Sequence, residues 1–137
     1  MTKSWRKPLL ITLSFSLIYE IAFAGAVLLA PDWALQQSGL PVNQETLFLG
    51  FGLGWCLVAI ALFCALALKL VLENDTNGYL LTDILGYWWV VVGLAMYFKW
   101  GRMDNLIMDA LKGAVLLVCN YKARKGANPP FKTGLFD

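Results

Sequence analysis

The chain has 137 residues, of which 59% are hydrophobic and only 15% are charged, and its mean hydropathy is +0.63. This composition excludes an ordinary soluble domain and predicts an integral membrane protein. A formal net charge of +2, without a basic stripe, argues against nucleic-acid binding. Histidine is absent and the three cysteines show no paired spacing. We therefore expect no metal site and no bound cofactor, and we expect the thiols to be buried and inert.

The first three apolar segments predict membrane-spanning helices at residues 8–30, 47–72 and 79–98. The first ends at Pro31, which cannot continue a helix, and it is too long for the apolar part of a cleaved signal peptide. The loop after it is polar and contains a short interfacial turn at residues 32–35. Each span is about 20 residues or longer, as a hydrocarbon core of about 30 Å requires.

The fourth segment, residues 104–121, is shorter and carries Asp109 and Lys112. We interpret it as a fourth span, with a re-entrant or interfacial helix as the alternative. Residues 122–137 are polar, contain adjacent prolines and are expected to form an extended tail. The sequence thus predicts an all-α, four-transmembrane-helix bundle that makes up a single domain over residues 1–137.

Lysine and arginine are distributed unevenly between the two predicted sides of the membrane. One side carries Lys99 and Arg102, whereas the side that holds both termini carries Lys3, Arg6, Lys7, Lys69, Lys122, Arg124, Lys125 and Lys132. Cytoplasmic segments of membrane proteins are enriched in these residues, so both termini are predicted to be cytoplasmic.

Charged residues inside a span are costly and call for a partner or a role. At 1.5 Å per residue, Glu20 lies about 18 Å from the cytoplasmic end of its helix, and Lys112 falls at nearly the same depth. We therefore predict a Glu20–Lys112 pair. Asp109 shares a helix face with Lys112 and completes a candidate catalytic cluster. Asp83 is predicted to form a shallower pair with Lys69.

The cluster has two interpretations. In the first, these charges are structural and fix the register of the helices in lipid. In the second, Glu20 accepts a proton or binds a substrate that enters from the membrane, and Asp109 and Lys112 assist it.

Two further features suggest packing or binding. Gly50 and Gly54 form a G-x-x-x-G face, typical of close helix packing within a chain or of a homodimer. Tyr87, Trp88 and Trp89 lie near the middle of the third span, where core packing or lipid contact is the ordinary explanation. The alternative is an aromatic wall for an apolar small molecule such as a quinone, a sterol or a carotenoid.

Several short motifs together resemble small DoxX-like four-helix membrane proteins: residues 30–33 (Ala-Pro-Asp-Trp), residues 38–40 (Ser-Gly-Leu), the glycine-rich start of the second span and residues 109–113 (Asp-Ala-Leu-Lys-Gly). This resemblance implies a four-helix bundle and, for some relatives, association with quinone-linked redox complexes. The mid-membrane Glu20 is also similar in placement to a carboxylate of small multidrug transporters, but the charges of the fourth segment do not fit that family.

Three classes of function remain open. The first is an accessory or structural subunit of a larger membrane complex, which needs a membrane-protein partner besides the lipid bilayer. The second is a lipid-pocket enzyme, an isomerase, cyclase or hydrolase, in which Glu20 and Asp109 divide the acid and base roles. The third is a proton-coupled small transporter, for which a homodimer is expected because four helices hardly enclose a pathway.

Overall fold

The computed structural model describes residues 5–126, and every regular element within that range is helical. The order along the chain is α1 (Arg6–Leu29), α2 (Pro31–Gln37), α3 (Gln44–Leu72), α4 (Thr76–Trp100), α5 (Met103–Asn105), η1 (Leu106–Leu111) and α6 (Lys112–Lys125). The element η1 is a π-helix, in which the hydrogen bonds join residues five positions apart. The predicted all-α class is therefore confirmed for the described residues.

Three of the helices, α1, α3 and α4, are long and apolar enough to cross a membrane. Each begins two or three residues before the predicted boundary, and the turn expected at residues 32–35 is the short helix α2. A helix can cross lipid because all its backbone groups are hydrogen-bonded internally. The chain is accordingly a membrane protein with transmembrane helices whose apolar faces contact lipid.

Side chains cap both ends of α3. At its start, the Asn43 side chain accepts a hydrogen bond from the backbone N–H of Thr46 at 2.9 Å, and the Thr46 hydroxyl accepts one from the backbone N–H of Asn43 at 3.1 Å. At its end, the Arg6 guanidinium donates to the carbonyl oxygens of Val71 and Leu72 at 3.2 and 2.8 Å. The Val71 carbonyl also accepts from the backbone N–H of Asn74 at 3.2 Å. Arg6 thus completes the hydrogen bonding at this helix end and holds the start of α1 beside the end of α3.

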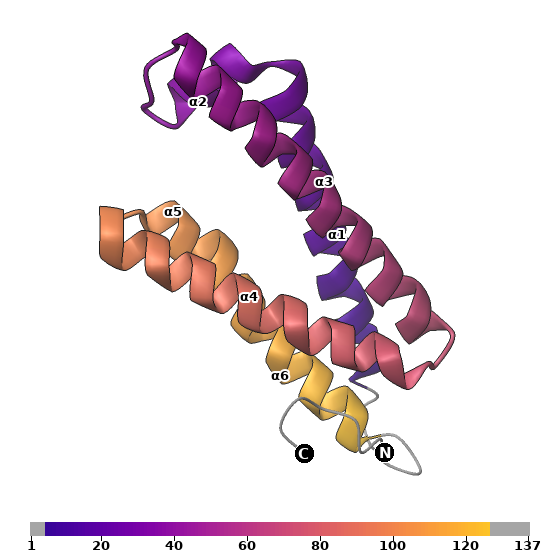
Figure 1. Ribbon diagram of the computed structural model, residues 1–137. Helices are drawn as coiled ribbons and strands as arrows, with labels where there is room; N and C mark the ends of the chain where they lie inside the picture. Colours follow the sequence, from indigo (N-terminus) through magenta and orange to yellow (C-terminus); the bar gives the residue numbers. More distant parts are fainter. Residues whose placement is uncertain (1–4, 127–137) are drawn as a thin grey trace.

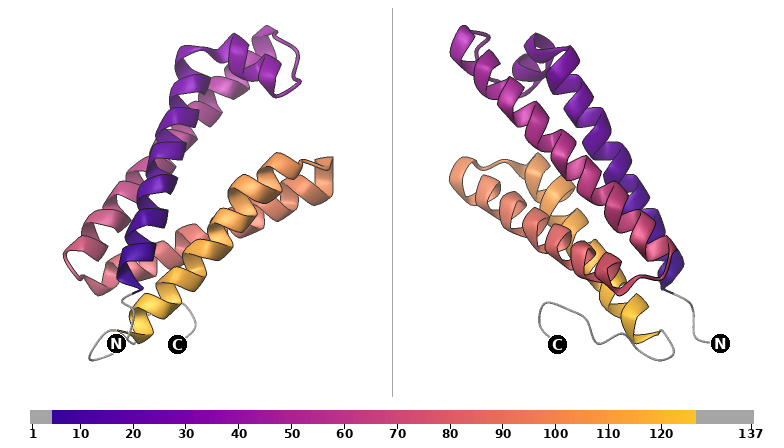
Figure 2. Two further views of the ribbon diagram at one scale, coloured as in Figure 1. Left: turned by 180° about the vertical axis from the view of Figure 1, so that it is seen from behind. Right: turned by 45° about the vertical axis from the view of Figure 1, so that its right-hand side comes forward.

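The long helices form two antiparallel hairpins that meet at one end and diverge towards the other (Figure 1). The first hairpin is α1 with α3, and the second is α4 with α5, η1 and α6. The start of α1, the turn between α3 and α4, and the end of α6 lie where the hairpins meet. Both other views show the same divergence (Figure 2). We call the two units the first and the second hairpin.

Glycine residues bring the two sides of the second hairpin into backbone contact. A Cβ atom on Gly93 would lie 2.8 Å from the Cβ of Ala110 and 2.8 Å from the carbonyl oxygen of Asn105. A Cβ on Gly113 would lie 2.6 Å from the carbonyl oxygen of Gly86. No real side chain tolerates such distances, so these positions require glycine. Close backbone approach of this kind is a usual means of helix association in membranes.

Gly50 and Gly54 behave differently from one another. A Cβ on Gly54 would lie 2.5 Å from a methyl carbon of Leu28, so this glycine admits the α1 side chain. No described atom lies within 4 Å of a Cβ on Gly50. The two glycines therefore do not form one joint contact face between α1 and α3.

The stretch from Met103 to Lys125 follows the expected fourth segment but ends later than predicted. Helix α6 continues past Tyr121, the predicted end, and the side chains of Ala123 and Arg124 are buried. The first residues of the expected tail are thus helical, because Arg124 has a buried partner described below. The rest of the expected tail, from residue 127, lies outside the described residues.

Candidate functional site

The centre of the site is the ammonium group of Lys112, where the two hairpins are in contact. Its Nζ atom lies 2.8 Å from Oε1 of Glu20 on α1 and 3.6 Å from Oδ1 of Asp109 on η1. The Glu20 and Lys112 side chains are only 3% and 4% exposed, and that of Asp109 is 14% exposed. The structure therefore brings together the three charged residues that the depth estimate predicted to meet. We call them the Lys112 cluster.

Glu20 reaches this position because it lies on the buried face of α1. The buried residues of that helix recur at the three- and four-residue spacing of one helical face: Leu9, Leu13, Ser16, Glu20, Ala24 and Val27. The opposite face, with Ile11 and Ile18 among its members, is exposed to lipid. A carboxylate on the apolar buried face must be paired, and Lys112 from the other hairpin supplies the partner.

Two aromatic rings enclose the same ammonium. Lys112 Nζ lies 4.1 Å from the centre of the Trp89 ring and 4.6 Å from that of Tyr19. A cation over an aromatic face is attracted by the negative potential of the ring, and more strongly where water is absent. Sequence reasoning missed Tyr19. Its position next to Glu20 was the available signal, because an ion pair in lipid gains from aromatic neighbours.

Asp109 is held by the π-helix. Its Oδ2 atom accepts a hydrogen bond of 2.8 Å from the side-chain amide of Asn105, four residues earlier. The backbone then passes directly from η1 to α6 at Lys112. Single π-helical turns inside longer helices are frequent at functional sites, because they alter the direction in which side chains project. Here the turn presents both Asp109 and Lys112 to α1.

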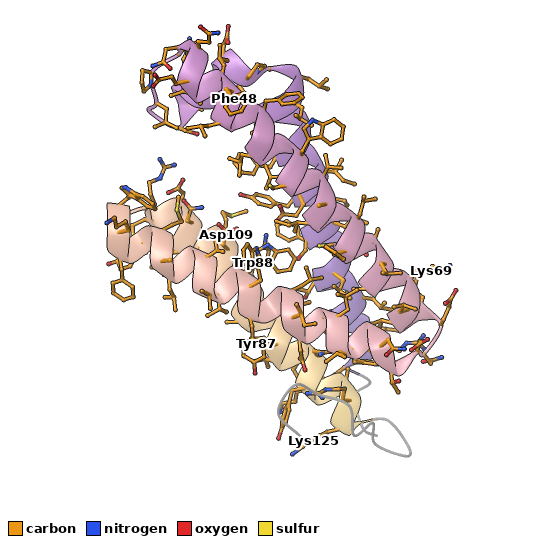
Figure 3. All side chains as sticks on the ribbon, in the orientation of Figure 1. Phe48, Lys69, Tyr87, Trp88, Asp109 and Lys125 are labelled. Atoms are coloured by element: carbon orange, nitrogen blue, oxygen red, sulfur yellow. The ribbon has the colours of Figure 1, made fainter. Side chains whose placement is uncertain are left out.

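The expected aromatic wall does not form. Trp89 is buried at 2% exposure against Lys112, whereas Trp88 and Tyr87 are 53% and 42% exposed. Figure 3 shows Trp88 on the side of α4 that faces the first hairpin and Tyr87 on the opposite side. Consecutive residues of a helix point about 100° apart, so the three rings cannot line one pocket.

Asp83 has a different partner from the one predicted. Its Oδ2 lies 3.3 Å from Nη2 of Arg124, and its Oδ1 accepts a 2.6 Å hydrogen bond from the side-chain amide of Asn120. Lys69 lies instead 4.0 Å from Glu73 on the surface of its own helix. The predicted Asp83–Lys69 pair is therefore wrong. The reason is that α6 extends far enough to bring Arg124 to Asp83.

A groove of about 370 Å³ runs between α1 and the η1–α6 stretch, next to the Lys112 cluster. Its volume is within the range of small-molecule sites. The Thr12 hydroxyl donates to the Pro8 carbonyl oxygen at 2.9 Å, and the Lys112 ammonium is bound to Glu20. The groove therefore offers mainly hydrocarbon. Its walls are Ile11, Thr12, Phe15, Ile107, Met108, Leu111, Lys112 and Val115.

One polar contact connects the hairpins at the end where they diverge. Arg102, between α4 and α5, donates from Nη1 to the Ser38 carbonyl oxygen at 3.1 Å. Asp104 accepts from Nε and Nη2 of the same guanidinium at 3.0 and 2.6 Å and so fixes its orientation. The hydrogen bond from Arg102 lowers the pKa of Asp104, and the same bond raises the pKa of Arg102. We call this contact the Arg102 bridge.

The three cysteines are free thiols. Cys64 and Cys119 are buried, as expected, but Cys56 is exposed on the surface of α3. Among residues 5–126, no three cysteine or acidic side chains come together as a metal ion would require.

No protein-family model, no curated protein and no solved structure matches the chain. Its function must therefore be argued from the arrangement of its own residues.

Proposed function

We propose that the protein is a non-catalytic accessory subunit of a larger membrane complex. In this proposal the Lys112 cluster joins the two hairpins, and another membrane protein packs between them where they diverge. The relation to DoxX-like proteins is part of the same proposal, because it would place the complex among quinone-linked redox assemblies.

The observation that carries the proposal is that the contacts of Lys112 are made within the chain. Its ammonium has three hydrogens, and around it lie two carboxylates and two aromatic faces. Little of this polar surface faces the neighbouring groove, whose walls are mainly hydrocarbon. A site that binds and converts a substrate normally presents a few unengaged polar groups to it. The cluster suits a structural role better.

The divergence of the hairpins supports a partner. Trp88 lies between them and is half exposed, so its large apolar ring is available to a partner. Within residues 5–126, the Arg102 bridge is the polar contact that links the hairpins at the diverging end. A space between two helical hairpins suits one or more apolar helices of a partner.

The test is site-specific photo-crosslinking in native membranes. A photoreactive phenylalanine analogue is placed at Trp88, between the hairpins, and in a matched control at Tyr87, on the opposite side of α4. The proposal predicts a discrete protein adduct from position 88, identified by mass spectrometry, that is weak or absent from position 87. Adducts with lipid alone or with a second copy of this chain would contradict it.

We further propose that the stretch from η1 to α6, residues 106–125, crosses the membrane as a fourth span, with both termini in the cytoplasm. The stretch packs alongside α4 and would extend about 30 Å at 1.5 Å per residue, which suffices for the hydrocarbon core. The bias of lysine and arginine towards the end with the termini favours this orientation. Reporter fusions after Gly126 and within residues 38–43 should report opposite sides of the membrane. The same side for both would contradict the orientation.

The position of Asp109 favours a chemical role as the alternative. Asp109 is a second carboxylate for a single ammonium, it lies in a π-helix, and it is the most exposed member of the cluster. In a lipid-pocket enzyme or a proton-coupled transporter, Asp109 would be the group that contacts substrate or carries a proton. This alternative predicts that Asp109→Asn abolishes turnover or transport while helicity and assembly persist.

A further inference from the structure

The groove between α1 and α6 leads towards two lysines at the end where the hairpins meet. On α1, Lys7 precedes Ile11 and Phe15 at four-residue spacing, so the three share one side of the helix. On the stretch from η1 to α6, Leu111, Val115 and Lys122 also fall on one side, at spacings of four and seven. Two helices thus place a lysine in line with the same apolar groove.

The two helices are in contact at this end. Lys122 Nζ lies 5.5 Å from the centre of the Trp5 ring, which precedes α1. Lys7 and Lys122 are both exposed, and neither forms an ion pair with a described acidic side chain. The view from behind shows α1 and α6 approaching one another here (Figure 2). Trp5 and the lysines form an aromatic and cationic rim, typical of the level of lipid headgroups.

The dimensions suit one lipid chain. From Leu111 to Lys122 the helix rises about 16 Å, since each residue contributes about 1.5 Å. The groove, with a volume of about 370 Å³, lies along the part of this path that is nearer to Leu111. An acyl chain in the groove would therefore place its phosphate near Lys7 and Lys122. The charge of the rim selects an anionic headgroup over a zwitterionic one.

We propose that this groove and rim bind one anionic phospholipid, with an acyl chain against Ile11, Phe15, Leu111 and Val115 and the phosphate between Lys7 and Lys122. The groove lies between the hairpins on the side of α1 and α6, whereas the proposed partner is tested at Trp88 on α4. The two proposals are tested at different residues with different measurements, so they can fail independently.

The first test is native mass spectrometry of the full chain in detergent micelles. Dioleoylphosphatidylglycerol and dioleoylphosphatidylcholine are titrated separately, and the fraction with one bound lipid is measured. The phosphatidylglycerol should bind more tightly to the unmodified chain. The double variant K7Q/K122Q should bind it about tenfold more weakly, while its weak binding of phosphatidylcholine stays the same.

A matched control removes two exposed lysines that are distant from the groove. The double variant K69Q/K99Q makes the same change in net charge and should leave the binding of both lipids unchanged. Equal binding of the two lipids by the unmodified chain would overturn the proposal. An equal loss of phosphatidylglycerol binding in K69Q/K99Q and K7Q/K122Q would also overturn it, because the lipid would then not bind specifically at Lys7 and Lys122.

The groove itself is tested by filling it. Val115→Trp should weaken the binding of phosphatidylglycerol, whereas Val91→Trp, on an exposed part of α4, should not. A second measurement covers the case in which Val115→Trp fails to fold, as judged by circular dichroism. Glycerophosphoglycerol, the headgroup without chains, should not displace the lipid from the unmodified chain at tenfold excess. Displacement, or full binding by a folded Val115→Trp variant, would overturn a role for the groove.

Discussion

The Nζ atom of Lys112 lies 2.8 Å from Oε1 of Glu20, and this bond connects the middle of α1 to the start of α6. Asp109 lies on the other side of the same ammonium at 3.6 Å. Both helical hairpins therefore contribute to one buried group of charges. The contribution of each member to stability depends on how many partners are left when it is removed.

Lys112→Met should destabilise the protein more than Glu20→Gln does. Removing Lys112 leaves Glu20 and Asp109 as two buried carboxylates without a cation, at a cost of about 3–5 kcal/mol. Glu20→Gln leaves Lys112 with Asp109 and with a side-chain oxygen, so about 1–3 kcal/mol is expected. Thermal unfolding in a fixed detergent gives the order. If Glu20→Gln were the more damaging change, the ammonium would not be the shared partner of both carboxylates.

Asp83→Asn should lower stability by about 1–3 kcal/mol, because it removes the charge that Arg124 contacts at 3.3 Å inside the protein. The control is Lys69→Gln, which removes a surface contact of 4.0 Å with Glu73. Exposed pairs of this kind contribute about 0–0.5 kcal/mol. Unfolding of both variants under the same conditions separates the pairs. A larger loss of stability for Lys69→Gln than for Asp83→Asn would contradict the Asp83–Arg124 pair.

Gly93→Ala should disrupt the contact between α4 and η1. The new Cβ would lie 2.8 Å from both the Cβ of Ala110 and the carbonyl oxygen of Asn105, and overpacking of this kind costs about 1–3 kcal/mol. Gly52→Ala is the matched control, because no described atom lies within 4 Å of its Cβ. Alanine there should be neutral or slightly stabilising. Equal stability of the two variants would show that α4 and η1 are not in backbone contact.

The hydrogen bonds from Arg102 to Asp104, which orient the Arg102 bridge, should weaken in acid. Because the hydrogen bond from Arg102 lowers the pKa of Asp104 in the folded protein, the bond is fully present above the ordinary carboxyl pKa. It is lost as the pH falls through the lowered folded value. Arg102→Gln should return the pKa of Asp104 towards its ordinary value, as measured by NMR titration of isotope-labelled aspartate. An unchanged titration would exclude the hydrogen bonds between Arg102 and Asp104 in solution.

The positions of the long helices and the Lys112 cluster could be predicted from the sequence. Both depend on the depth of each residue in the membrane, which can be counted along the chain. Apolar length gave α1, α3 and α4 to within a few residues at their starts. Depth also indicated that Glu20 and Lys112 could meet, since each needed a partner of opposite charge. Hydropathy does not indicate which side of each helix faces the protein core. Helix geometry indicates that Trp88 and Trp89 point about 100° apart, but it does not indicate that Trp89 is the buried one.

Other features depend on contacts that hydropathy does not report. Arg124 looked like a tail residue because it is charged, yet it is buried beside Asp83, which also accepts a hydrogen bond from Asn120. Asn120, an amide in an apolar segment, was the signal that was overlooked. The π-helix of residues 106–111 has no sequence signature, and the divergence of the hairpins follows from packing at the end where they meet.

The most direct test of the account compares the Lys112 cluster with an uncharged replacement. The triple variant Glu20→Gln, Asp109→Asn and Lys112→Met removes all three charges while keeping side chains of similar size. Such replacements are often neutral when the charges are structural. Two quantities are measured. The first is the yield of the protein adduct formed from position 88. The second is the catalytic turnover of the complex that contains the partner identified in that adduct. The account predicts that both stay within about twofold of the unmodified chain; full assembly with lost turnover would contradict it and assign chemistry to the cluster.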